Sequence, residues 1–525
     1  MTAGEPTDAN AVAPAGAPRL TLALPDEAAT VALAEDIAAI LKPGDVIALH
    51  GDLGAGKTTF ARALLRALAD DPALEVPSPT YTLVQPYELP RLAVAHLDLY
   101  RIGDPSELDE LGFDEFVATG AALVEWPERA GDRLPDTTLS LELAPGPDED
   151  SRVAVLTVDA GSWASRLART LGLRGFLDQS GFAGATRRHL AGDASARTFE
   201  RVASGERAAV LMNWPLRRDE TVVRDGRSYR QIARIAERAE PFVAVAAALK
   251  AHGYSAPDIH AADFESGFLL VEDLGRDGVV RTGADGEPEP IPERYEAAID
   301  LLADFHSDAM PPPVPVGEAG ELYVPPPYDT DALAIEVDLL PAWYLPSLGT
   351  EAMAAADIDR FQALWLVRFA ALEGRPVHWV LRDFHSPNLI WMADREGVAR
   401  IGLIDLQDTV VGSPAYDVAS LVQDARVTVP DDLHDALVAR YVAARREADP
   451  AFDEDGFRAD LAVMEAQRAT KILGVFVRLD RRDGKPHYLR HLGRIRHYLR
   501  KAVSHPVLSD LRVWYETAGI FRTDD

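Results

Sequence analysis

The 525-residue sequence contains no cysteine. That absence excludes disulfide bonds and cysteine-ligated zinc or iron–sulfur sites, and nothing in the composition points to an oxidising compartment. Long apolar runs are also missing, since no segment approaches the roughly 20 residues that span a membrane. Residues 1–18 are rich in Ala, Pro and Gly and lack a basic start followed by an apolar stretch. We therefore expect a disordered tail rather than a signal peptide, and a cytoplasmic protein.

Positive charge is scarce: 53 Lys and Arg residues face 84 Asp and Glu residues, which gives a formal net charge of −31. A surface this acidic repels phosphate backbones. We therefore expect no direct binding of nucleic acid and no membrane association. Any phosphate site must be built locally from backbone N–H groups, a cationic side chain and a metal ion. The chain is 47% hydrophobic and exceeds the roughly 250–300 residues of a single core, so it should divide into two to four domains.

The stretch "HGDLGAGKTTFARALLRALAD", His50 to Asp70, contains the pattern G-x-x-x-x-G-K-[ST]. A β-branched apolar run precedes it and leucines at helical spacing follow it, which predicts strand, glycine turn and helix. In that context backbone N–H groups curl around the β-phosphate of ATP, Lys57 reaches the β- and γ-phosphates, and Thr58 holds Mg²⁺. A glycine turn without a ligand is the alternative. The predicted nucleotide-binding residues of this loop are Gly51, Asp52, Gly54, Ala55, Gly56, Lys57, Thr58 and Thr59.

Two acidic residues further along the chain end apolar strand-like runs. Asp98 ends the run in "RLAVAHLDLYR", and Glu125 ends the run in "ALVEWPERA". A carboxylate at the carboxyl end of a strand faces the ligand crevice of an open α/β sheet. We predict Asp98 as a second metal-side group and Glu125 as the catalytic residue that orients the attacking water. A helix cap or a turn residue is the alternative for each.

The segments "GDLGAGKTTFARALL", "VPSPTYTLVQPYE", "HLDLYR", "LGFDEF" and "LVEWPERA" occur in this order. Together they resemble the TsaE family, the ATPase subunit of the bacterial machinery that makes threonylcarbamoyladenosine on tRNA. The resemblance covers about residues 20–170. It implies a P-loop domain with a small, mostly parallel sheet that acts with partner subunits carrying the transferase chemistry. It also implies that Lys57, Thr58, Asp98 and Glu125 bind and hydrolyse ATP–Mg²⁺, that Thr80 senses the nucleotide, and that Trp126 faces nucleotide or partner.

A second set of polar residues lies in "VLRDFHSPNLIW" and "IGLIDLQD". Asp383 and Asn388 are spaced as in the catalytic-loop pattern H-R-D-x-x-x-x-N, and Asp405 ends a short apolar strand. In such a site one carboxylate accepts the proton of the attacking hydroxyl while an amide and a second carboxylate hold Mg²⁺. We predict Asp383 as the catalytic base, with Asn388 and Asp405 as metal ligands. Ordinary loop and turn residues are the alternative.

The segments "GDASAR", "LVEDLG", "RDFHSPNLIW", "IDLQD" and "SPAYDVASLVQDAR" resemble the aminoglycoside-phosphotransferase-like kinases, over roughly residues 175–515. Among these the AmgK-type kinases, which phosphorylate the anomeric hydroxyl of N-acetylmuramate or N-acetylglucosamine in cell-wall recycling, are the most similar. The resemblance implies a two-lobed α+β fold and an amino-sugar substrate. It also implies Asp193, Ser195 and Arg197 in the nucleotide loop, Asp273 on the inter-lobe hinge and Asp417 as a structural anchor. Read alone, "AGDASAR" fits a hairpin turn better than a phosphate loop.

Two positions depart from the kinase pattern. Leu381 stands before "RD" where a histidine is usual, and "RAAVLMNWP" lacks the lysine that pairs with the nucleotide phosphates. Arg197 could replace that lysine. The Pro-rich pieces "AMPPPVPV" and "YVPPPYD" should form extended loops at the mouth of the substrate site.

We therefore expect an α/β P-loop NTPase domain followed by an α+β kinase-like domain. The expected boundaries are a tail at 1–18, the ATPase domain at 19–172, a small lobe at 173–278 and a large lobe at 279–525. The expected function is bifunctional, with ATP and Mg²⁺ as cofactors. In the alternatives the C-terminal half is a non-catalytic binding module, or it phosphorylates another small hydroxyl compound.

Overall fold

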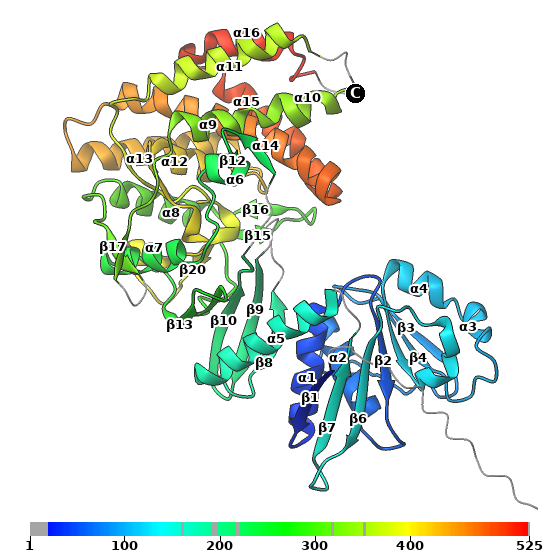
Figure 1. Cartoon of the computed structure of the whole chain (residues 1–525). Helices are drawn as coiled ribbons and strands as arrows, with labels where there is room; N and C mark the ends of the chain where they lie inside the picture. Colours follow the sequence, from blue (N-terminus) through cyan, green and yellow to red (C-terminus); the bar gives the residue numbers. More distant parts are fainter. Residues whose placement is uncertain are drawn as a thin grey trace, which may run out of the picture. The chain divides into compact units, whose positions relative to one another are not determined.

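The computed structural model describes residues 19–158, 162–190, 197–216, 221–316, 320–349 and 353–522 (Figure 1). The chain divides into two compact units, Met1–Asn213 and Trp214–Asp525. Among the helices of the described ranges, none combines the length and the apolar character needed to cross a lipid bilayer.

The first unit is built on a seven-stranded sheet with the order β1-β7-β6-β2-β5-β4-β3. The four central strands β6, β2, β5 and β4 are parallel, while β7 and β3 run antiparallel to their neighbours. This arrangement confirms the expected mostly parallel sheet. The strands are β1 (Arg19–Leu24), β2 (Val46–His50), β3 (Val84–Tyr87), β4 (Val94–Asp98), β5 (Ala121–Glu125), β6 (Leu139–Pro145) and β7 (Arg152–Thr157).

Helices cover both faces of this sheet, so its central strands are apolar throughout. Alternate residues of β2 show the division: Ile47 and Leu49 pack with α1, α2 and α5, whereas Val46 packs with α3, α4 and the turn η1 on the other face (Figure 1). The helices are α1 (Glu27–Ile40), α2 (Lys57–Ala69), α3 (Glu107–Glu110), α4 (Phe113–Thr119), η1 (Pro127–Arg133) and α5 (Ser162–Gln179).

Helix α5 runs without a break through the position near Leu173 where we expected a domain boundary. Three antiparallel strands follow it in the same unit: β8 (Thr186–Leu190), β9 (Thr198–Ser204) and β10 (Arg207–Asn213). The last two pair as an antiparallel hairpin, with Thr198 opposite Asn213.

The second unit begins with short elements: β11 (Val222–Arg224), β12 (Arg227–Ser228), α6 (Tyr229–Ile232), α7 (Glu240–Ala251) and the hairpin β13 (Ile259–Asp263)–β14 (Phe268–Val271). Two further hairpins follow, β15 (Val280–Thr282)–β16 (Pro288–Pro290) and β17 (Val314–Val316)–β18 (Glu321–Tyr323).

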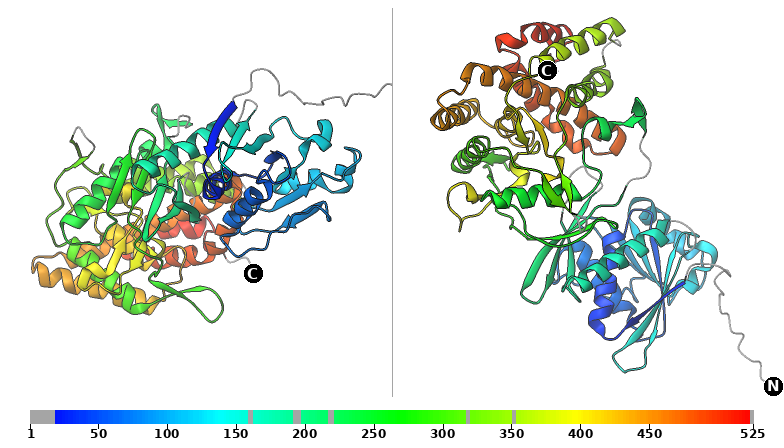
Figure 2. Two further views of the ribbon diagram at one scale, coloured as in Figure 1. Left: turned by 90° about the horizontal axis from the view of Figure 1, so that it is seen from below. Right: turned by 60° about the vertical axis from the view of Figure 1, so that its left-hand side comes forward.

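The rest of this unit is mainly helical, and α9, η2, α12 and α15 pack on α14 (Glu454–Asp483), which is labelled in Figure 1 and drawn in deeper orange than α13 in Figures 1 and 2. A helix with neighbours on many sides must be apolar over much of its circumference, and α14 buries seventeen of its thirty residues. Gly474 lets the backbone of a neighbouring segment approach α14 closely, because an added Cβ would lie 2.4 Å from the backbone of Leu339. The other helices of this part of the unit are α8 (Pro292–Phe305), α9 (Thr330–Val337), η2 (Leu340–Tyr344), α10 (Leu345–Ser347), α11 (Ala355–Ala370), α12 (Ala415–Val422), α13 (Asp431–Ala448), α15 (Leu492–Ala502) and α16 (Ser509–Thr517).

Two small antiparallel pairs hold the predicted catalytic loops of this unit. Strand β19 (His378–Val380) pairs with β22 (Val410–Gly412), and β20 (Leu389–Trp391) pairs with β21 (Ile401–Leu403). The loop with Asp383 therefore lies between β19 and β20, and the loop with Asp405 lies between β21 and β22.

Candidate functional sites

The predicted P-loop lies between β2 and α2, and each of its three glycines has a positive φ. At Gly51 the φ is +136°, and an added Cβ would come within 2.4 Å of the Leu143 carbonyl oxygen, so only glycine fits. Lys57 is the first residue of α2 and is only 5% exposed. Its ammonium group donates to the carbonyl oxygens of Gly51 (2.6 Å) and Asp52 (3.1 Å), which holds the cation over the loop.

The strand order brings both predicted acids to this loop. Strands β2, β5 and β4 are neighbours, and Asp98 pairs with Glu125 in the β4–β5 register, so both carboxylates lie beside the P-loop edge. Each residue is 3% exposed. Asp98 accepts a hydrogen bond from the Thr80 hydroxyl (2.9 Å) and another from the Tyr100 N–H (3.0 Å). The structure thus places the predicted switch residue directly on the predicted metal-side acid.

His96 is a site residue that we did not predict. Its Nε2 lies 3.0 Å from Glu125 Oε1, and both side chains are buried. Its Nδ1 is buried and has no partner within the described residues. With a hydrogen on Nε2, the ring donates to the Glu125 carboxylate. A sequence signal existed: His96 and Asp98 stand two residues apart on β4 and so point to the same face.

Aromatic side chains border the P-loop. The Lys57 ammonium lies 4.4 Å from the centroid of the Trp126 ring, which itself lies 5.1 Å from the Tyr100 ring. Trp126 has a φ of +58°, an uncommon conformation for a bulky residue. Leu53 within the loop is 92% exposed and Tyr81 is 87% exposed. Of the other predicted loop residues, Asp52 and Gly54 are exposed, Ala55 is buried, and Gly56, Thr58 and Thr59 are half-buried.

The predicted kinase residues also come together. Asn388 donates from Nδ2 to the Asp383 carbonyl oxygen (2.9 Å), and its own carbonyl accepts from the Ile404 N–H (3.2 Å). Because Leu389 pairs with Leu403, the residue before β20 and the residues after β21 are adjacent. Asn388 and Asp405 therefore meet at one end of this hairpin. Asp405 adopts a φ of +61° and accepts from the side chain of Gln407 (3.0 Å).

The side chain of Asp383 is 38% exposed, so an acceptor hydroxyl can reach it. Burial raises its pKa, but His385, Lys471, Arg382 and Arg468 lower it by more, and the net pKa lies below the ordinary value. The carboxylate is therefore ionised at neutral pH and able to accept a proton.

Asp417 holds the loop that carries this base. It is fully buried and accepts the backbone N–H groups of Leu381 and Arg382, both at 2.7 Å. Burial raises the pKa of Asp417 to about 7 despite these bonds. Arg382 itself has a φ of +68°, and its guanidinium bonds Glu336 and the carbonyl of Ala233.

The nucleotide side of this half is only partly described. Asp193 and Ser195 lie outside the described residues. Arg197 is described, with its guanidinium 5.9 Å from the Phe199 ring centroid. Asn213, at the end of β10, accepts from the Arg169 guanidinium (2.7 Å). Asp273, after β14, accepts from the Gly275 N–H (3.0 Å).

The two predicted metal sites contain few charged ligands. Within the ranges that the structure describes, no group of three or more His, Asp or Glu side chains is arranged to hold a metal ion. Each predicted set instead has one carboxylate, with a hydroxyl (Thr58 and Asp98) or an amide (Asn388 and Asp405). Mg²⁺ is often bound by one or two protein groups together with waters and phosphate oxygens, so both sets fit a magnesium ion that arrives with a nucleotide.

Comparison with known proteins matches each half separately. Residues 24–153 match the family described as threonylcarbamoyl adenosine biosynthesis protein TsaE, and residues 186–455 match the phosphotransferase enzyme family. An N-acetylmuramate/N-acetylglucosamine kinase of Caulobacter vibrioides is 35% identical over 353 residues, which cover 65% of this chain and 94% of that protein. The kinase of the same description from Pseudomonas aeruginosa is 35% identical over 327 residues, with 61% and 84% covered.

On the N-terminal side, the tRNA threonylcarbamoyladenosine biosynthesis protein TsaE of Aquifex aeolicus is 43% identical over 129 residues. These cover 25% of this chain and 89% of that protein. Both resemblances noted from the sequence are thereby confirmed. The chain belongs to the TsaE family through its N-terminal P-loop domain and to the phosphotransferase enzyme family through its C-terminal domain.

Proposed function

We propose that this chain is a bifunctional enzyme. Its P-loop domain hydrolyses ATP in the threonylcarbamoyladenosine modification of tRNA, and its C-terminal domain transfers the γ-phosphate of ATP to the anomeric hydroxyl of N-acetylmuramate or N-acetylglucosamine. The observation that carries this proposal is that each half brings together its own set of polar side chains: Lys57, Asp98 and Glu125 in one, Asp383, Asn388 and Asp405 in the other.

In the P-loop domain Lys57 binds the β- and γ-phosphates from the position its two carbonyl contacts prepare. Glu125 orients the attacking water with its free oxygen, while His96 occupies the other oxygen at 3.0 Å. Thr80 reports the state of the nucleotide through its bond to Asp98.

In the kinase domain the ionised Asp383 accepts the proton of the sugar hydroxyl, whose oxygen attacks the γ-phosphorus while the bond from that phosphorus to the β–γ bridging oxygen breaks and ADP leaves. Asp417 keeps the loop in position by accepting two of its backbone N–H groups. Thr58 with Asp98, and Asn388 with Asp405, would hold Mg²⁺, which supplies charge neutralisation for the phosphates.

Partner subunits that carry the transferase chemistry are part of this proposal. A chain with a net charge of −31 has little attraction for tRNA by itself. The exposed side chains of Leu53 and Tyr81, on the P-loop and the switch segment, offer an apolar contact surface whose shape can depend on the bound nucleotide.

We retain the proposed domain limits of 19–172, 173–278 and 279–525, and a cytoplasmic location, where ATP is available.

A non-catalytic C-terminal half is the second candidate, motivated by the lack of a lysine in β10. The presence of both metal-side groups and an ionised base argues against it. A different small hydroxyl acceptor is the third candidate.

The direct experiment incubates the full-length protein with ATP, Mg²⁺ and a panel of amino sugars, and measures sugar 1-phosphate. ATP hydrolysis is measured separately with the transferase partner subunits. We expect Lys57→Ala to abolish only the partner-dependent hydrolysis and Asp383→Asn to abolish only sugar phosphorylation. Absence of turnover with every sugar would refute the kinase assignment, and loss of both activities in either variant would refute two separate sites.

A further inference from the structure

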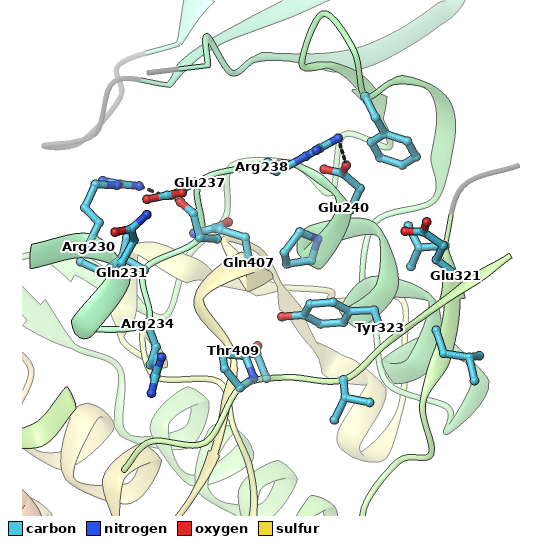
Figure 3. A pocket seen from close by; sticks show the side chains of 18 residues that line it. Arg230, Gln231, Arg234, Glu237, Arg238, Glu240, Glu321, Tyr323, Gln407 and Thr409 are labelled. Atoms are coloured by element: carbon cyan, nitrogen blue, oxygen red, sulfur yellow. Dashed lines mark hydrogen bonds and ion pairs between the residues drawn. The ribbon is translucent and has the colours of Figure 1, made fainter. Parts of the chain in front are cut away.

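A pocket of about 860 Å³ lies in the second unit, outside the residues assigned above (Figure 3). Its walls come from the segment between α6 and α7, from the β17–β18 hairpin with the Pro-rich residues after it, and from the turn that follows Asp405. The volume lies within the roughly 300–1,000 Å³ that is usual for small-molecule sites.

One wall of the pocket is bonded to both catalytic loops. The guanidinium of Arg382, next to Asp383, donates to the carbonyl oxygens of Ala233 (2.8 Å) and Arg234 (3.2 Å). On the other side, the Ala236 N–H donates to Asp408 (2.7 Å). Arg234 has a φ of +58°, and strained backbone of this kind is enriched at functional sites. The pocket is therefore fixed relative to the base and to the metal-side loop.

Gln407 connects the pocket to the metal-side carboxylate. It is 2% exposed and lines the pocket, and its Nε2 donates to Asp405 at 3.0 Å. Its Oε1 is buried and has no partner within the described residues. A buried amide oxygen without a donor costs free energy, so this atom is suited to accept a hydrogen bond from a bound ligand. Figure 3 shows the Tyr323 hydroxyl pointing toward the side of the pocket that holds Thr409 and Gln407.

The charges of the lining balance, since three arginines (Arg230, Arg234 and Arg238) accompany three glutamates (Glu237, Glu240 and Glu321). Arg238 and Glu240 are paired at 2.5 Å, and the second oxygen of Glu240 is buried with no hydrogen-bond partner among the described residues. A triphosphate requires an excess of positive charge, which this lining does not supply. Apolar side chains, among them Phe264 and Pro326, complete the walls. Paired charges, hydroxyls and apolar patches together suit an uncharged polyhydroxylated ring.

We propose that this pocket is the acceptor site and binds the amino sugar, with Gln407 and Tyr323 on one side and the Arg238–Glu240 pair on the other. The proposal rests on the kinase function proposed above and specifies where its substrate binds. Gln407 then lies between sugar and metal-side loop, so that it can position the acceptor relative to the phosphate that Asp405 helps to hold.

The test measures KM for N-acetylglucosamine and KM for ATP in the full-length protein. Glu240→Gln removes the charge and keeps the shape, and Tyr323→Phe removes one hydroxyl. We expect Glu240→Gln to raise the sugar KM about tenfold and Tyr323→Phe about fivefold, with the ATP KM changed less than twofold. Val324→Trp, at a position 55% exposed in the lining, should abolish sugar phosphorylation and leave ATP binding intact.

Glu289→Gln is the matched control, because Glu289 forms a comparable pair with Arg281 (3.3 Å) in the β15–β16 hairpin, outside the pocket lining. It should leave both KM values unchanged. A raised ATP KM with an unchanged sugar KM would make the pocket part of the nucleotide site and overturn the proposal, as would unchanged values in all three variants. If the unmodified protein phosphorylates no sugar, the kinase function itself fails. If the unmodified protein phosphorylates a sugar and the pocket variants keep its KM values, the kinase function stands and only the proposed position of the sugar site is wrong.

Discussion

Asp36 of α1 and Arg187 of β8 form a buried ion pair, with 2.7 Å between Oδ1 and Nη1 and side chains that are 3% and 1% exposed. Arg187 also bonds Glu200 of β9 (2.6 Å), and Arg174 of α5 bonds Asp36 from the other side (2.6 Å). Burial raises the pKa of Glu200, but Arg187 lowers it by more, so the network is ionised. Asp36 lies in the TsaE match and Arg187 in the phosphotransferase match, so charges from both families join within one compact unit.

Removing the Asp36 carboxylate from these buried ion pairs should destabilise the first unit. Asp36→Asn leaves Arg187 and Arg174 without their shared carboxylate, and breaking a buried pair of this kind costs about 3–5 kcal/mol. We expect a lower Tm and faster hydrogen exchange in β8 and β9. Asp70→Asn is the control, because Asp70 pairs with Arg188 (2.9 Å) at the surface, where the effect should stay within about 0.5 kcal/mol. Equal effects of the two substitutions would contradict this role of the network.

His96 should matter for ATP hydrolysis through Glu125. His96→Leu removes the donor and leaves a buried carboxylate oxygen unpaired, so we expect partner-dependent kcat to fall at least about tenfold while KM for ATP stays within about twofold. His96→Gln can still donate from its amide and should recover most of the rate. A purely structural histidine would instead lower the Tm in proportion to the lost rate, and would not be rescued by glutamine.

Lys471 of α14 should influence the pH below which the kcat of the kinase falls. After His385, Lys471 is the side chain that lowers the pKa of Asp383 most. Lys471→Met should therefore raise that pKa. A smaller fraction of the base is then ionised at low pH, and the acidic limb of the kcat profile should move to higher pH while the rate near pH 8 changes little. Lys250→Met, at an exposed pair with Asp258, should leave the profile unchanged. An unmoved limb in the Lys471 variant would contradict the electrostatic role.

Gly474 should be required for packing around α14. Gly474→Ala places a Cβ 2.4 Å from the Leu339 backbone and should cost about 1–3 kcal/mol, because helix and neighbour must separate. Gly493→Ala in α15 meets no atom within 4 Å and should be neutral or stabilise by up to about 1 kcal/mol. Chemical denaturation gives the free energy of unfolding of each variant, and the difference between the two measures the cost of the close packing at Gly474. A Gly474 variant as stable as the Gly493 variant would show that α14 packs more loosely than described.

Much of the fold and site could be predicted because the signals are local. The P-loop is a strand, a glycine turn and a helix in sequence order, and Asp98, Glu125 and Asp405 each end an apolar strand. His96 was missed because a single histidine in an apolar strand is typical of a core residue. The Asp36–Arg187 pair joins residues 151 positions apart, and no periodic pattern announces such a contact.

The position near Leu173 illustrates a further limit. We expected a domain boundary there, yet α5 continues through Gly172 and Gly175 because its buried side, including Leu173 and Leu177, packs against the unit. The acceptor pocket could not be located from sequence, since segments far apart in the chain build it. Only the role of the Pro-rich pieces as its border was anticipated, and that role stays a prediction until the sugar site is tested.

Nucleotide stoichiometry is the most direct measurement of the central claim that the chain holds two independent ATP sites. Calorimetric titration of the full-length protein with a non-hydrolysable ATP analogue and Mg²⁺ should give two equivalents. Lys57→Ala should retain one of them, and Lys57→Ala combined with Asp405→Asn should retain none. A single equivalent in the unmodified protein that disappears entirely in the Lys57 variant would contradict the two-site account.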